Sequence, residues 1–305
     1  MVREHEVRVD DLIYPLFVVH GQGIKSEIKA LPGNYHFSVD RLVEEAKEVR
    51  DLGIPAILLF GVTEKRDNRA SEAYSDQGIV QQAVRKLKQS LPDLVVVTDV
   101  CSCEYTDHGN CGILEDGYLV NDASVDLLVK TTLSHARAGA DIVAPAAMLD
   151  GQVRSMRMAL ETEGFPDVAI MSYAAKFASR LYDPFFQSTN AATCVDKRTH
   201  QMDYANSDEA MREIALDIEE GADICIVKPG LFYLDIVYRA KQQFGFPLAV
   251  YNTSGEYALL NAAAEAGRVD ESTIRMEMIT AFKRAGADLI ITYYAKQIAA
   301  ELQGS

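Results

Sequence analysis

Basic residues and long apolar runs are both scarce in this sequence, and each scarcity excludes a class of partner. Lysine and arginine together number 30 against 45 aspartates and glutamates, a formal charge of -15. This balance argues against nucleic acid and anionic membranes as partners. No run approaches the roughly 18 apolar residues that cross a bilayer. The start, MVREHEVRVDD, lacks the apolar segment of a signal peptide. We therefore expect a soluble, cytoplasmic protein.

Cysteine is also sparse, and its distribution is uneven. There are five cysteines, and three of them, Cys101, Cys103 and Cys111, fall within eleven positions. An odd number with this clustering does not suit a disulfide framework. It indicates a metal site or a reactive site in a reducing compartment.

No glycine-rich dinucleotide fingerprint follows any early strand, but another pattern repeats throughout. A segment with helical periodicity ends at a glycine or proline and is followed by a short apolar strand. The expected strands are Leu12–Val19, Ala56–Phe60, Leu94–Val97, Gly139–Pro145, Val168–Ser172, Ile224–Val227, Pro247–Tyr251 and Asp288–Thr292. The main expected helices are 39–49, 78–90, 125–136, 152–163, 209–220, 231–244, 256–266 and 271–285, with a short last helix ending near Leu302.

This alternation predicts parallel strands joined by right-handed crossovers. Eight such units in 305 residues favour a single closed (β/α)8 TIM barrel over an open doubly wound sheet. The tripeptide GAD precedes a strand three times, beginning at Gly139, Gly221 and Gly286. Each glycine stands where a helix C-cap is expected.

Two lysines stand at the ends of neighbouring predicted strands. The apolar run Ile224–Val227 leads directly to Lys228 and a Pro-Gly turn, and the preceding strand leads to Lys176. The carboxyl ends of barrel strands carry the active site. Burial and a second positive charge both lower a lysine pKa, which produces the neutral amine that forms Schiff bases. An isolated lysine could equally extend to water, but a pair indicates covalent capture of carbonyl substrates.

The clustered cysteines follow the third predicted strand, in DVCSCEYTDHGNCG. Three thiolates suit Zn²⁺ and leave a fourth position open, as in catalytic zinc sites. The alternatives are free cysteines or a closed site completed by His108. Asp99, Ser254 and Tyr293 also lie at strand ends and are expected to face the same mouth.

Several segments of the sequence resemble a known family. The phrases DDLIYPLFVVHG, SEAYSDQGIVQQAVR, DVCSCEYTDHGNCG, MSYAAKFAS, QMDYANSDEA, GADICIVKPGLFYLDIV, SGEYAL and GADLIITYYAK resemble porphobilinogen synthase (5-aminolevulinate dehydratase) along nearly the whole chain. The resemblance implies a homo-oligomeric lyase of tetrapyrrole (heme) biosynthesis. It condenses two 5-aminolevulinate molecules to porphobilinogen with loss of two waters.

The resemblance also implies roles for individual residues. Lys228 and Lys176 would each hold one substrate as a Schiff base, and the three cysteines would bind a zinc ion that polarises one substrate. The implied substrate-binding residues are Asp99 beside the metal, Ser254 and Tyr293 on one substrate carboxylate, and Gln201 and Lys197. Glu213 falls where some bacterial members bind an allosteric magnesium. The N-terminal arm that wraps a neighbouring subunit in the family would be shortened here, to about residues 1–10.

The chain departs from the family pattern at several positions. Ala146-Ala147 stands for a usual Ser-Asp, and Asn110 for a common histidine. Phe186 and Lys197 stand for two arginines that clamp the carboxylate of the second substrate. Phenylalanine cannot replace a bidentate guanidinium, and lysine replaces it only in part.

These departures leave alternatives to the synthase open. One is the same lysine and zinc chemistry on an amino ketone that lacks the distal carboxylate. The other is a non-catalytic paralogue that senses metal or binds a pyrrole precursor, against which the retained lysines and cysteines speak.

Overall fold

Eight parallel strands close into a barrel in the computed structural model, which describes residues 1–189 and 196–304. In barrel order the strands are β1 (Leu12–Val19), β4 (Ala56–Val62), β5 (Val95–Val100), β8 (Ile142–Pro145), β9 (Ala169–Lys176), β10 (Ile224–Lys228), β11 (Leu248–Asn252) and β12 (Leu289–Thr292). Pairing of β12 with β1 closes the ring. The predicted (β/α)8 barrel is confirmed.

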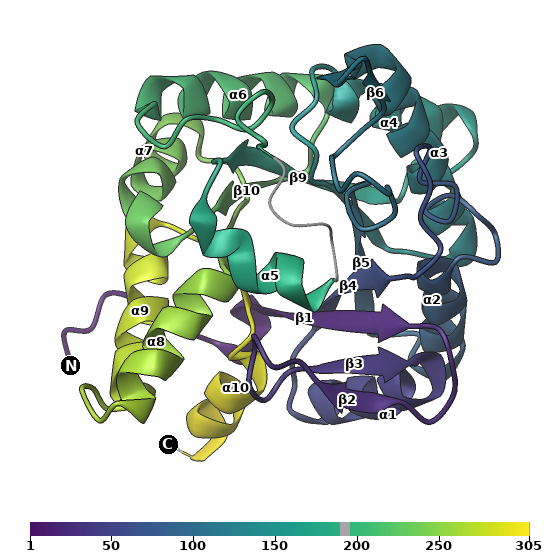
Figure 1. Cartoon of the computed structure of the whole chain (residues 1–305). Coiled ribbons are helices and arrows are strands. Elements are labelled where there is room, and N and C mark those ends of the chain that lie inside the picture. The colour runs from purple at the N-terminus through teal and green to yellow at the C-terminus, as the bar shows by residue number, and fades with distance from the viewer. Residues whose placement is uncertain (190–195, 305) are drawn as a thin grey trace.

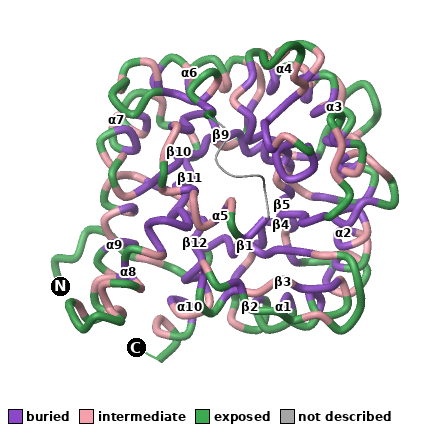
Figure 2. Tube along the Cα trace, in the orientation of Figure 1, coloured by how far each residue is buried: buried purple, intermediate pink, exposed green. Residues whose placement is uncertain are grey.

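Helices surround the strands on the outside, except that α5 lies across the opening of the barrel, as Figure 1 shows. They are α1 (Val39–Asp51), α2 (Ile79–Ser90), α3 (Asn121–Ala138), α4 (Gln152–Thr162), α5 (Asp183–Ser188), α6 (Ser207–Glu220), α7 (Leu234–Phe244), α8 (Ser254–Glu265), α9 (Glu271–Ala285) and α10 (Ala295–Gly304). Figure 2 shows burial concentrated in the strands and exposure on the outer sides of the helices. Every residue of β4 and β11 is buried, as expected for strands covered on both faces.

Some elements were not predicted. An antiparallel pair, β2 (Lys25–Glu27) and β3 (Tyr35–Ser38), extends the sheet beside β1, and a small hairpin joins β6 (Leu114–Glu115) to β7 (Tyr118–Leu119). These strands are too short for periodicity to detect. Three 3-10 turns, at Val9–Asp11, Arg180–Tyr182 and Leu231–Tyr233, were also missed. The last of them replaces the first turn of the helix expected from Leu231.

The three GAD tripeptides form one repeated structure at the amino ends of the strands. Each glycine is a left-handed C-cap, with φ of 102°, 102° and 112° at Gly139, Gly221 and Gly286. Each following aspartate then accepts hydrogen bonds from a cation on an earlier helix and from the backbone N–H of the preceding barrel strand. The three sets are Asp141 with Lys88 and Val96, Asp223 with Arg157 and Ile170, and Asp288 with Lys241 and Leu248.

Across the described ranges, no helix has the length and apolar character needed to cross a membrane. Cys194, one of the five cysteines of the sequence, lies outside the described ranges.

Candidate active site

Lys176 and Lys228 lie side by side at the carboxyl ends of neighbouring strands. They are register partners in the parallel pairing of β9 with β10, and each is only 7% exposed. Each of the two strands therefore ends in a lysine whose side chain has little access to water. The sequence placed both lysines at strand ends, and the barrel closes around them.

The Lys228 ammonium lies among aromatic rings. Its Nζ is 4.2 Å from the ring centroid of Tyr251, 5.0 Å from that of Tyr173 and 5.1 Å from that of Tyr182. Burial, with the positive charge of Lys176, lowers the pKa of Lys228 to about 7. A substantial fraction of this side chain is therefore a neutral, nucleophilic amine near neutral pH.

Lys176 has a different set of contacts. Its Nζ donates a hydrogen bond to the backbone oxygen of Ala146 and lies 5.4 Å from the ring centroid of Tyr173. Ala146 is one of the two alanines that depart from the family pattern, and it carries no side-chain acceptor. The main chain supplies the acceptor at this position instead.

Glu256 holds the turn that follows Lys228, and sequence reasoning did not single it out. One carboxylate oxygen accepts the N–H groups of Gly230 and Leu231, and the other accepts those of Thr253 and the Asn252 side chain. Glu256 is 1% exposed, and burial raises its pKa to about 7 although the four donors favour the anion. The sequence signal that could have identified Glu256 is the capping box that it forms with Thr253 at the start of α8.

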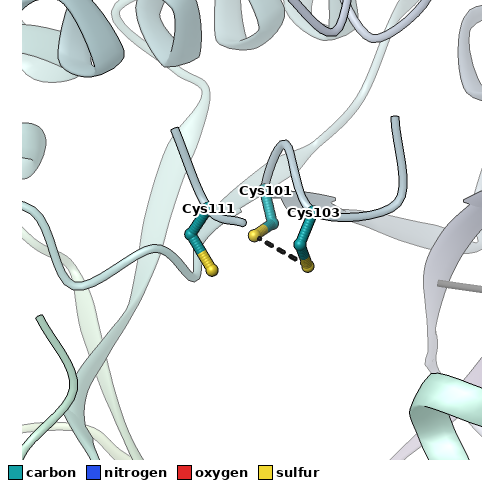
Figure 3. Close-up of side chains that lie close together, drawn as sticks. All are labelled: Cys101, Cys103 and Cys111. Carbon is teal, nitrogen blue, oxygen red and sulfur yellow. Dashed lines mark hydrogen bonds between the residues drawn. The ribbon is translucent and has the colours of Figure 1, made fainter. Parts of the chain in front are cut away.

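Cys101, Cys103 and Cys111 bring their sulfur atoms together beyond the end of β5 (Figure 3). The three atoms lie within 4.8 Å of one another, and the residues are at most 4% exposed. Three sulfurs bound to one zinc at about 2.3 Å would be roughly 3.8 Å apart. The cluster therefore fits a metal ion with soft ligands.

His108 does not belong to this cluster. Its Nδ1 accepts a hydrogen bond from the backbone N–H of Asn110 at 3.1 Å, and burial lowers its pKa. Among the described residues, the cysteines are the only group of three or more metal-ligand side chains close enough to share an ion. A closed site completed by His108 is not what the structure contains.

Lys197 and Phe186 lie next to the cysteines. The Lys197 Nζ is 3.4 Å from the Cys111 sulfur and 4.7 Å from the centroid of the Phe186 ring. Burial lowers the pKa of Lys197, but the negative cysteine cluster outweighs this effect and raises it well above the usual value. Hydrogen bonds from Cys101 and Cys103, and then the Lys197 charge, lower the pKa of Cys111.

A narrow cavity of about 20 Å³ connects the lysine pair to the cysteine cluster. Its lining includes Lys176, Lys228, Asp99, Lys197, Gln201, Phe186 and the cysteines Cys101 and Cys103. Burial raises the pKa of Asp99 to about 7. The Gln201 Nε2 is buried with no hydrogen-bond partner within the described ranges. Such a donor beside a cavity is suited to a bound ligand.

Ser254 and Tyr293 lie outside that lining. The Ser254 hydroxyl donates to the Leu181 backbone oxygen at 3.2 Å and accepts from the Phe185 N–H at 3.1 Å, which joins α8 to α5. The Tyr293 hydroxyl lies 3.3 Å from that of Tyr251. Their predicted contact with a substrate carboxylate stays a prediction.

Glu213 lies in a separate pocket of about 750 Å³, on α6. Asp150 and Glu209 line the same pocket. Partial burial, followed by these two neighbouring carboxylates, raises the pKa of Glu213.

Three comparisons with known proteins give the same family. The family model described as "Delta-aminolevulinic acid dehydratase" matches residues 1–301. A dehydratase of this name from Synechocystis sp. is 52% identical over 308 residues, covering 99% of this chain and 94% of that protein. One from Bacillus subtilis is 48% identical over 300 residues, covering 98% and 93%.

A solved structure is similar over the same extent. The dehydratase (porphobilinogen synthase) of Toxoplasma gondii, crystallised with the reaction product porphobilinogen, superposes with a TM-score of 0.96 at 40% identity. The match covers 98% of this chain and 87% of that chain. The family model matches nearly the whole chain, and relatives about 50% identical carry the same name. The chain therefore belongs to the delta-aminolevulinic acid dehydratase family.

Proposed function

We propose that the protein is a cytoplasmic porphobilinogen synthase, a lyase that condenses two 5-aminolevulinate molecules to porphobilinogen and two waters. The observation that supports this most directly is the register pairing of Lys176 and Lys228 beside three buried cysteines. One amine can hold each ketone, so the two substrates become neighbours at one barrel mouth. Holding both reactants in place turns a reaction between two molecules into an intramolecular one.

Lys228 forms the imine most readily, because its pKa near 7 supplies the neutral amine. The amine attacks the ketone carbon, and the carbonyl oxygen leaves as water once the imine forms. The aromatic rings of Tyr251 and Tyr173 exclude bulk water from the nitrogen. Lys176 holds the other ketone, with its nitrogen oriented by the Ala146 carbonyl.

Cys101, Cys103 and Cys111 would hold a zinc ion. When bound, it would supply Lewis-acid polarisation of a substrate oxygen. Three thiolates select a soft or borderline ion over Mg²⁺. Magnesium would instead use the carboxylate pocket of Glu213, as a regulatory ion.

The alternatives receive no support from the relatives or the structure. Relatives at about 50% identity over nearly the whole chain carry the dehydratase name, and both lysines and all three clustered cysteines are present. Neither a different amino ketone nor a non-catalytic role is needed to account for the site.

We also propose a homo-oligomer. Large apolar side chains are exposed around a pocket of about 940 Å³ between α6, α7 and α8, including Phe232, Tyr204 and Leu259. Exposed apolar surface of this kind marks contact with another protein. Light scattering after size-exclusion chromatography tests this, and a monomeric mass would contradict it.

The function is tested by incubating the zinc-loaded protein with 5-aminolevulinate and identifying the product by mass spectrometry and NMR. Borohydride should trap a substrate adduct on Lys228, located by peptide mapping. The variant Lys228→Met should form neither the Lys228 adduct nor porphobilinogen. A wild-type protein that yields no pyrrole and no adduct would refute the proposal. Turnover only of ketones without a distal carboxylate would favour the different amino ketone.

A further inference from the structure

Lys197 points at sulfur, although the family resemblance implies that it binds a substrate carboxylate. Its Nζ lies 3.4 Å from the Cys111 sulfur, close enough for a charge-assisted hydrogen bond, and the residue is 7% exposed. Cys111 itself has no exposed surface. Burying a long, flexible lysine side chain in one conformation costs conformational entropy, which the contact with the sulfur must offset.

Phe186 keeps the ammonium in place from the other side. Its ring centroid is 4.7 Å from the Lys197 Nζ, within the range of a cation–π contact. The ring itself packs edge-on against Phe185 and Tyr182, with centroids 6.1 and 6.5 Å away. An arginine at position 186 would place a second positive charge against this ammonium. The aromatic ring accommodates the charge instead.

The cysteine cluster needs a nearby positive charge. Three thiolates and one divalent ion carry a net charge of about -1. The Glu104 carboxylate adds to this, because its Oε2 lies 3.2 Å from the Cys103 sulfur and the residue is 3% exposed. Uncompensated negative charge in such a buried place is costly. Lys197 supplies such a charge, since its Nζ is in hydrogen-bond contact with the Cys111 sulfur.

We propose that Lys197 is a positioning residue of the cysteine metal centre: it neutralises and orients Cys111, and thereby strengthens metal binding, in place of clamping a substrate carboxylate. This inference rests on the metal centre of the proposed function. It also explains why Phe186 and Lys197 depart from the family pattern together. The Phe186 ring contacts the Lys197 ammonium, and that ammonium contacts the Cys111 sulfur.

The test measures zinc affinity without catalysis. The dissociation constant of the purified protein for zinc is determined by competition with a chromophoric chelator, for wild type, Lys197→Met and Lys197→Arg. Loss of a partner that orients a metal ligand typically weakens binding by about 10- to 100-fold. We expect a loss of this size in Lys197→Met and a substantial recovery in Lys197→Arg, which keeps the charge.

The matched control is Arg198→Met, which removes the neighbouring positive charge. Arg198 is exposed and pairs with Asp196, so its removal should leave zinc affinity unchanged. Unfolding curves of each zinc-free variant check that the fold is retained. Unchanged zinc affinity in Lys197→Met would overturn the proposal, as would an equal loss in the control.

Kinetics separate this role from that of a clamp. If Lys197 clamped a substrate carboxylate, Lys197→Met would raise the KM for 5-aminolevulinate even at saturating zinc. A raised KM with unchanged zinc affinity would assign Lys197 to the substrate. Failure of the wild-type chain to bind zinc or form porphobilinogen would instead refute the proposed function itself.

Discussion

Lys176 and Lys228 are register partners on β9 and β10, and the ring of Tyr173 lies within 5.4 Å of both side-chain nitrogens. One parallel strand pair therefore fixes the separation of the two amines. The consequence is electrostatic as well as geometric, because the charge on Lys176 contributes to the low pKa of Lys228.

The pH dependence of imine formation at Lys228 should follow from this pairing. Below a pH of about 7 the Lys228 amine is protonated and cannot attack, so borohydride trapping of 5-aminolevulinate should rise with pH through about 7 and then level off. In Lys176→Met the midpoint should move to higher pH, because a positive charge has been removed. Intact-mass measurement of the adduct against pH tests both. An unmoved midpoint would show that burial alone sets the pKa.

Each clustered cysteine should be required for the metal. Replacing Cys101, Cys103 or Cys111 by serine should remove stoichiometric zinc and lower activity by at least about 100-fold, because a harder and less acidic ligand enters the site. Cys225→Ala is the control, since this buried cysteine lies within β10 and outside the cluster. Elemental analysis of purified variants measures the metal. Full zinc content in a serine variant would contradict the assignment.

Glu256 should matter for both stability and turnover. Glu256→Ala leaves four hydrogen-bond donors without their carboxylate, which should lower the free energy of unfolding by about 3 kcal/mol. Displacement of the turn after Lys228 should lower kcat by about 10- to 100-fold. Glu256→Gln keeps an acceptor and should recover part of both. Glu265→Ala, at an exposed position of the same helix, should change neither. Urea unfolding and steady-state kinetics measure the two effects.

The GAD aspartates should contribute stability without affecting catalysis. Asp288→Ala removes the bonds from Lys241 and from the Leu248 N–H, at the end of the barrel opposite the lysines. Because the side chain is 45% exposed, the loss should be about 1 kcal/mol. Thermal unfolding measures this loss, with the exposed Asp167→Ala as control. A large fall in kcat/KM for Asp288→Ala would contradict a purely structural role.

Much of the barrel could be predicted because its signals are local. Apolar strands buried on both faces, helical periodicity and glycine C-caps each occupy a few consecutive residues. The short β2–β3 and β6–β7 pairs escaped prediction because their stability comes from the neighbours they join. Five of the eight predicted strands also end too early, for the same reason. β9 continues beyond its predicted end at Ser172 to Lys176, held by pairing with β10.

The candidate site likewise has a part that the sequence predicts and a part that depends on the tertiary structure. The sequence by itself determined that two lysines and three cysteines stand at strand ends, because strand order and chain direction bring all carboxyl ends to one mouth. It could not determine where Lys197 points, or that Glu256 reaches back to the turn after Lys228. Those contacts join residues 86 and 26 positions apart. Only the closed barrel decides them, because burial leaves each charged group few partners and the packing of distant segments selects which one it meets.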